Sequence, residues 1–193
     1  MSDVLSPFDD AATAAAVITS TQRWLERAVI GLNLCPFAKA VYVKRQIRYA
    51  VTAATTAKAL LAELRHEIEL LGKADPEQID TTLLIHPQAL NDFIDYHRFL
   101  KQADVAIRNL GQEGSLQIAS FHPSYEFAGS APDDIANFTN RSPYPMLHLL
   151  REASIDRAVA AFPDAATIYA RNIDTLRRLG HEGWRRLWTA DQA

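Results

Sequence analysis

Apolar residues recur along the chain with two spacings, one typical of helices and one typical of strands. Apolar positions three to four residues apart predict three long helices, one from Asp9 or Asp10 to about Ile30, one from Thr55 or Thr56 to Gly72, and one from Asn91 to Gly111. Alternating or compact apolar runs predict strands over 46–52, 81–85 and 115–121. Strands and helices therefore alternate through the middle of the chain.

The pattern changes after a proline-rich loop that follows the third strand. Ser142 is a suitable N-cap with Pro143 at the first helical position, and apolar residues then recur through Ala153 at helical spacing. Two more helices are predicted, from Ser154 to Ala161 and from Asp164 to Gly180. We therefore expect an α/β (or α+β) fold, with a small sheet of about three strands packed by helices and a helical C-terminal third. Residues 1–193 are expected to form one domain, with residues 1–8 loose.

Composition narrows the class of protein. Hydrophobic residues make up 48% of the 193 residues and charged residues 22%, as in ordinary globular proteins. The net charge of −3 makes nucleic acid an unexpected partner. The start of the chain lacks the features of a signal peptide, and no apolar run is long enough for a membrane span. A cytoplasmic protein is the expectation.

Three segments carry a family resemblance: GLNLCPFAKA, IASFHPSYEFAG and NFTNRSPYPMLHLLRE. With them the chain resembles an uncharacterised bacterial family that is classified as a domain of unknown function. The resemblance extends over nearly the whole chain and implies a single-domain, cytoplasmic bacterial protein. It supplies no activity and no site residue.

Two strands end in the same dipeptide, at His86-Pro87 and His122-Pro123. If these strands are parallel, both imidazoles leave the sheet at one edge, where open α/β sheets bind ligands. His122, Glu126 and His148 could supply acid–base groups or three ligands for a divalent metal. A metal is not favoured, because the chain has no compact ligand motif. The alternative is that each His-Pro merely ends a strand.

A second candidate site begins at Asn140-Arg141-Ser142. A helix that starts at Ser142 would offer free N–H groups beside the Arg141 guanidinium, an arrangement that suits phosphate or carboxylate. The helix would carry further polar groups on one face, at Tyr144, His148, Arg151 and Glu152. Asn137 and Asn140 would hold the substrate or the loop. The alternative is a structural cap, with Arg141 paired to Asp133 or Asp134.

Cys35 is the one cysteine in the chain. As the N-cap of a short helix that starts at Pro36, its thiol would have a lowered pKa and could act as a nucleophile. Its apolar neighbours favour a small buried side chain instead. Basic residues around 39–48 and the tryptophans of the C-terminal segment WRRLW are further candidates for binding, although solvated or core positions are the simpler interpretation.

These residues support three functional hypotheses. The first is a hydrolase or transferase for an anionic metabolite, with His122, His148 and Glu126 as catalytic groups. Its substrate would be bound by Arg141, Ser142, Asn137, Asn140, Tyr144 and Arg151. The second is a non-catalytic binding or assembly protein, which leaves a homo-oligomer open. The third is thiol chemistry at Cys35.

Overall fold

Four strands form one sheet, in the order β1 (Ile47–Val51), β2 (Thr81–Ile85), β4 (Met146–Arg151) and β3 (Leu116–Phe121). The structure is a computed structural model, and it describes residues 14–161 and 167–189. β1 and β2 are parallel, whereas β4 is antiparallel to both of its neighbours. The expected mixture of helices and strands is confirmed. The expected number of about three strands is one too few.

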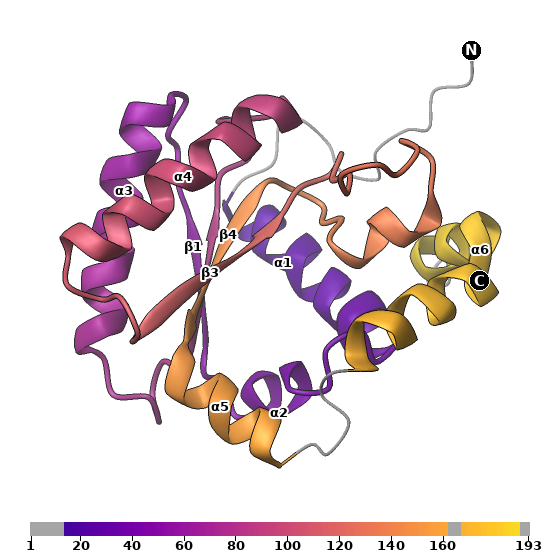
Figure 1. Cartoon of the computed structure of the whole chain (residues 1–193), viewed down its shortest axis with the longest axis horizontal. Coiled ribbons are helices and arrows are strands. Elements are labelled where there is room, and N and C mark those ends of the chain that lie inside the picture. Colours follow the sequence, from indigo (N-terminus) through magenta and orange to yellow (C-terminus); the bar gives the residue numbers. More distant parts are fainter. Residues whose placement is uncertain (1–13, 162–166, 190–193) are drawn as a thin grey trace.

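Helices cover both faces of the sheet (Figure 1). α3 (Ala57–Lys73) and α4 (Phe93–Asn109) pack on one face. α1 (Ala14–Trp24), its π-helical continuation η1 (Leu25–Ile30) and α6 (Ile168–Thr189) pack on the other. The shorter elements are α2 (Ala38–Val43), η2 (Ile135–Thr139) and α5 (Glu152–Ala160). The predicted starts at Asp9 or Asp10 and at Asp164, and the loose segment 1–8, lie outside the described residues.

The prediction of a helix from Ser142 to Ala153 is wrong, because β4 occupies residues 146–151. β4 lies between β2 and β3 and is covered on both faces. Leu147 and Leu149 belong to the core under α3 and α4, and Met146 belongs to the core under α1. A strand that is buried on both faces has a nearly continuous apolar sequence, which also satisfies helical spacing. The helix begins only at Glu152.

One further boundary differs from the sequence prediction, and one agrees with it. α2 begins at Ala38 with Phe37 as its N-cap, so Cys35 precedes the helix and does not cap it. Regular helix geometry ends at Gly180, as the sequence predicts, and a second helical segment within α6 follows it to Thr189. Gly180 has φ +64°, a backbone conformation that glycine adopts far more readily than other residues.

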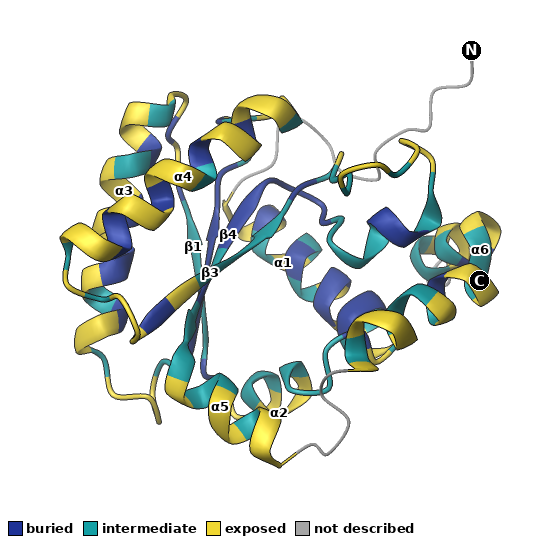
Figure 2. Ribbon diagram, in the orientation of Figure 1, coloured by how far each residue is buried: buried dark blue, intermediate teal, exposed yellow. Residues whose placement is uncertain are grey.

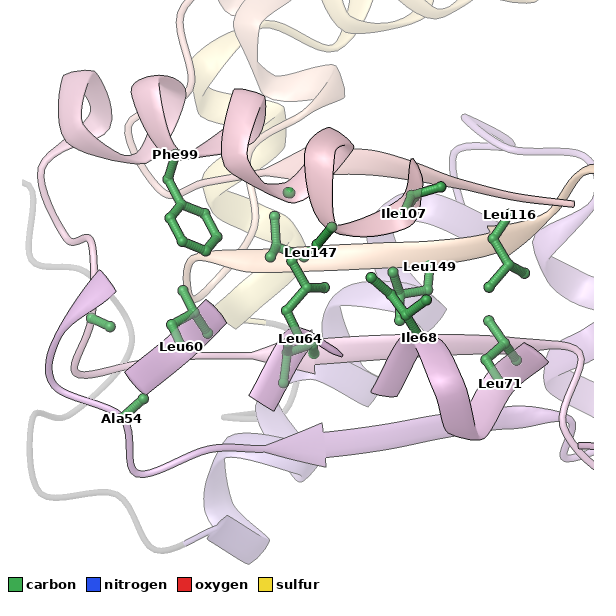
Figure 3. Close-up of a cluster of buried hydrophobic side chains, with 14 of the residues drawn as sticks. Ala54, Leu60, Leu64, Ile68, Leu71, Phe99, Ile107, Leu116, Leu147 and Leu149 are labelled. Carbon is green, nitrogen blue, oxygen red and sulfur yellow. The ribbon is translucent and has the colours of Figure 1, made fainter. Parts of the chain in front are cut away.

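Two apolar clusters hold the layers together. Figure 3 shows the cluster between the sheet and the α3–α4 pair, in which Leu60, Leu64, Ile68 and Leu71 of α3 are fully buried. The second cluster lies between the sheet and the α1–α6 side and includes Trp24. Figure 2 shows the same division along α1, α3 and α4, with the inner positions buried and the outer positions exposed. Full burial of each leucine stabilises the fold by roughly 2 kcal/mol.

Candidate functional site

The carboxyl ends of three strands lie at one edge of the sheet. β2 and β3 are both antiparallel to β4, so they point the same way, and β1 is parallel to β2. His86 and His122 therefore leave the sheet at the same edge, with the start of β4 between them. The backbone N–H of His86 donates to the Pro145 carbonyl at 3.0 Å, and that of His122 donates to the Asn140 carbonyl at 3.2 Å. Backbone hydrogen bonds thus hold the polar loop 122–145 against this edge of the sheet.

The two imidazoles are buried and stack around one tyrosine. His86 is 0% exposed and His122 is 1% exposed. The ring of Tyr96, from α4, lies 5.8 Å from the ring of His86 and 5.0 Å from that of His122, between centroids. The Tyr96 hydroxyl accepts from the Phe121 N–H at 3.0 Å and donates to the Met146 carbonyl at 2.8 Å. Tyr96 therefore joins the end of β3 to the start of β4.

His122 has hydrogen bonds at both ring nitrogens. The Ser124 N–H donates to Nδ1 at 3.0 Å, so the proton of the neutral ring is on Nε2, which donates to the Leu90 carbonyl at 3.2 Å. Burial lowers the pKa of His122 and keeps the ring neutral. A ring that is buried and bonded in this way is poorly placed to act as the general base that the sequence suggested.

His86 differs from His122 at one ring nitrogen. Its Nδ1–H donates to the Ala89 carbonyl at 2.8 Å, while Nε2 has no hydrogen-bond partner among the described residues. Burial lowers the pKa of His86 to about 4. The neighbouring loop residue Leu90 has φ +55°, a strained conformation for a bulky side chain. An unbonded buried acceptor beside a strained loop is the most unusual polar feature at this edge.

The amide side chains of the loop 122–145 hold the loop itself. The buried Asn137 Oδ1 accepts from the Phe127 N–H at 3.0 Å and from the Ser130 hydroxyl at 2.8 Å. Its Nδ2 donates to the Ala131 carbonyl at 2.9 Å. Asn140 donates from Nδ2 to the Ser120 carbonyl at 3.1 Å. Of the two roles that the sequence suggested for these amides, substrate or loop, their hydrogen bonds match the loop.

Arg141 is half-buried and also bonds to the loop. Its guanidinium donates to the Tyr125 carbonyl at 3.2 Å and to the Pro132 carbonyl at 2.6 Å, and lies 4.3 Å from the ring centroid of Phe138. No helix begins at Ser142, whose hydroxyl donates to the Tyr144 carbonyl at 2.6 Å. The predicted anion site of helix N–H groups at Ser142 therefore does not form. The predicted pairing of Arg141 with Asp133 or Asp134 is replaced by bonds to backbone carbonyls.

Tyr144, His148, Arg151 and Glu152 do not share a helix face. His148 lies opposite Leu83 in the sheet and contacts Phe121, on the α1 side, whereas His122 faces α4. Because the Thr81 hydroxyl donates to the Leu149 carbonyl, it accepts from His148 Nε2–H, at 2.7 Å. Burial lowers the pKa of His148 to about 4. His122 and His148 are therefore separated by the sheet and do not form one acid–base pair.

Arg151 lies at the opposite end of the strands from His122, where β4 ends and β3 begins. Its guanidinium donates to the carbonyls of Leu71 and Ala74 at 2.6 and 2.7 Å, where α3 ends. Glu152 is the first residue of α5, where the positive end of the helix dipole stabilises a carboxylate. Tyr144 is buried in the cluster on the α1 side. These residues serve the fold at three separate places.

Glu126 and Cys35 complete the set of candidates. Glu126 is half-buried and acts electrostatically on Arg141. Cys35 packs against the cluster under α1, and burial raises the pKa of its thiol, the direction that disfavours the thiolate. Within residues 14–161 and 167–189, no three His, Cys, Asp or Glu side chains are grouped to hold a metal ion.

Sequence reasoning missed the central role of Tyr96 at this edge. The tyrosine follows the apolar stripe of α4, and its helical spacing indicated only a core position. The sequence also favoured His122 over His86 as a site residue, although His86 is the histidine with an unbonded ring nitrogen. No signal in the sequence indicates which of two similar His-Pro steps has a free ring nitrogen.

The fold and the site define an α/β protein whose strand-end loop is closed by its own side chains. The family model described as "Protein of unknown function (DUF1415)" matches residues 16–186, and the chain belongs to this family. Searches of curated proteins and of solved structures find no match. In the described part of the chain, none of the helices is long and apolar enough to cross a membrane.

Proposed function

We propose that the protein binds an anionic partner through the layer that α1, η1, α2 and α6 form. The observation that carries the proposal is the distribution of charge. Residues 14–45 and 167–189, here called the basic layer, contain ten Lys or Arg and three Asp or Glu, a formal charge of +7. Residues 46–161 contain ten Lys or Arg and fifteen Asp or Glu, a formal charge of −5. Five more acidic residues, Asp3, Asp9, Asp10, Asp164 and Asp191, lie outside the described residues and bring the net charge of the chain to −3.

The basic layer presents many of its cations to solvent. Nine of its ten cations are exposed, namely Arg23, Lys39, Lys44, Arg45, Arg171, Arg177, Arg178, Arg185 and Arg186. An excess of one charge on a surface attracts ligands of the opposite charge and raises their rate of association. The layer can therefore attract an anion although the chain as a whole is negative.

The hydrogen bonds of the strand-end loop also favour binding over catalysis. His122, Asn137 and Arg141 each bond to backbone groups of the protein, as a structural framework requires. A catalytic role needs at least one of these groups to be available to a substrate. The best geometric support is thus for a binding protein, with the loop as part of its framework.

Retention on immobilised heparin, a generic polyanion, tests this proposal. We expect the wild-type protein to be retained at low salt, and Arg177→Glu with Arg178→Glu to lower the eluting salt concentration. The matched control is Arg65→Glu with Lys101→Glu, which makes the same change in charge at exposed positions of α3 and α4. No retention of the wild type, or an equal loss in the control, would contradict the proposal.

One observation favours a second candidate function, chemistry on an anionic metabolite at the strand edge. His86 Nε2 is an unbonded acceptor at the carboxyl end of β2, and a substrate that displaced the loop 86–92 could use it as a base. We expect a phosphorylated or carboxylated metabolite to raise the Tm of the wild type and not that of His86→Gln. If no compound in such a panel shifts the wild-type Tm, this candidate fails.

A further inference from the structure

The apolar side of α6 is already covered. Leu176 is fully buried, and Trp184, Leu187 and Trp188 pack on the cluster under α1. The helix is also held by hydrogen bonds, from Arg27 to the Leu187 carbonyl and from Asn172 Nδ2 to the Leu34 carbonyl at 2.7 Å. A surface helix that binds a bilayer needs a free apolar face to insert. α6 has its cations outward and its apolar side inward, which disfavours a membrane partner.

A protein partner is disfavoured for a related reason. Stable protein interfaces depend on a few apolar or aromatic anchors that become fully buried. In the described part of the basic layer, the exposed large apolar side chains are Val43, 70% exposed, and Tyr169, 59% exposed. The two are isolated from each other, on α2 and at the start of α6. A second copy of this chain that docked on this layer would meet the same shortage of anchors.

A nucleic acid needs no such anchors, because phosphate contacts alone supply most of its non-specific affinity. The kink at Gly180 divides α6 into two segments that each carry an arginine pair, Arg177-Arg178 and Arg185-Arg186. Eight residues separate equivalent members of the two pairs, and the kink lies between them. Cations repeated along one element suit a polymer with a charge on every unit.

Partly exposed aromatic rings on the same helix as the arginine pairs favour single strands over duplexes. The ring of Tyr169 contacts Phe127 edge-on, which leaves much of its surface open to solvent. Trp188, at the other end of α6, is partly exposed. Unpaired bases stack on such rings, while the bases of a duplex are already stacked on each other.

We infer that the anionic partner is a single-stranded nucleic acid, with its phosphates at the two arginine pairs of α6 and a base stacked on Tyr169. The inference rests on the proposed function, since it names the partner of the same basic layer. It predicts binding with little sequence preference and a strong dependence on salt.

Fluorescence anisotropy with a labelled sixteen-residue oligo-dT tests the inference on the full chain. We expect Arg177→Gln with Arg178→Gln to reduce the slope of log K against log salt by about 0.7 for each phosphate that the variant no longer neutralises. Tyr169→Ala should weaken binding roughly ten-fold, because a base can no longer stack on the ring. Arg65→Gln with Lys101→Gln, on the opposite face, should leave both quantities unchanged. Circular dichroism of each variant checks that it is folded.

The outcomes separate the two proposals. Retention on heparin without oligo-dT binding would overturn the nucleic-acid inference and leave the proposed function standing. Failure to bind either would overturn both. Equal or tighter binding to a duplex of the same length, or binding only to vesicles that contain phosphatidylserine, would also overturn the inference.

Discussion

His86 and His122 hold two consecutive residues of one loop. His86 donates to the Ala89 carbonyl and His122 to the Leu90 carbonyl, from strands that β4 separates. The two bonds keep Leu90 in its left-handed conformation between the rings and the start of α4. The histidines of the two His-Pro steps therefore act together, as parts of the framework at this edge.

Loss of the His122 imidazole should destabilise the protein. His122→Ala leaves the Ser124 N–H and the Leu90 carbonyl without their partner, at a cost of about 1–3 kcal/mol. Urea unfolding measures the change in the free energy of unfolding. His97→Ala, at an exposed position of α4, is the control and should cost little. Unchanged stability in His122→Ala would contradict the structural role.

The hydroxyl of Tyr96 should contribute measurably to stability. Tyr96→Phe keeps the ring between the two histidines but removes the link between the Phe121 N–H and the Met146 carbonyl. We expect a loss of about 1–3 kcal/mol in chemical denaturation, because a buried donor and acceptor lose their partner. Tyr169→Phe is the matched control on an exposed ring and should be close to neutral. Equal effects in the two variants would argue against the link.

Stability should fall as the pH falls from about 6.5 towards 4. The pKa of His86 is about 4 in the folded protein, below its usual 6.5, so between these values the unfolded chain binds more protons. Its contribution is therefore complete above pH 6.5 and is lost on acidification, by a total on the order of 3 kcal/mol. Urea midpoints measured across this range should fall for the wild type.

Replacement of His86 isolates its contribution to this pH dependence. His86→Phe should flatten the curve in part, and the remaining slope should include His148, whose pKa is also about 4. An identical pH dependence in His86→Phe and the wild type would show that His86 is not buried in its neutral form.

The ion pair between β1 and α3 offers a further test. Glu67 is buried and accepts from Arg48 Nε at 2.7 Å and from Nη2 at 2.9 Å. Arg48→Met leaves the Glu67 carboxylate buried without a partner, and we expect a loss of about 1–3 kcal/mol, since Arg48 is partly solvated. The double variant Arg48→Met with Glu67→Leu should recover much of this loss. A double variant no more stable than Arg48→Met would show that the unpaired Glu67 carboxylate is not what destabilises the single variant.

Local patterns in the sequence predict the three strands that precede the loop and the helices between them. They fail at β4 because Met146, Leu149 and Leu150 fit a helical stripe, while pairing with strands distant in sequence decides the outcome. They fail at Arg141 for a similar reason. Its partners are carbonyls of Tyr125 and Pro132, and backbone acceptors leave no mark in the sequence.

Charge was the other quantity that the sequence could not resolve. The net value of −3 argued against nucleic acid, because a sum over the chain ignores the side on which each residue lies. The packing of α1, η1, α2 and α6 in one layer brings their charge of +7 together. The −5 of residues 46–161 lies outside α3 and α4, whose own charges sum to +1. The basic layer is thus a property of the fold and of distant segments together.

The most direct test of the central claim is to map the bound surface by amide chemical shifts. Addition of oligo-dT to isotope-labelled protein should shift resonances of residues 14–45 and 167–189, most strongly around Arg177 and Arg185. Resonances of α3 and the outer face of α4 should stay in place. Shifts confined to the loop 86–92 and the strand edge would contradict binding at the basic layer. The absence of shifts at an excess of oligo-dT would contradict it as well.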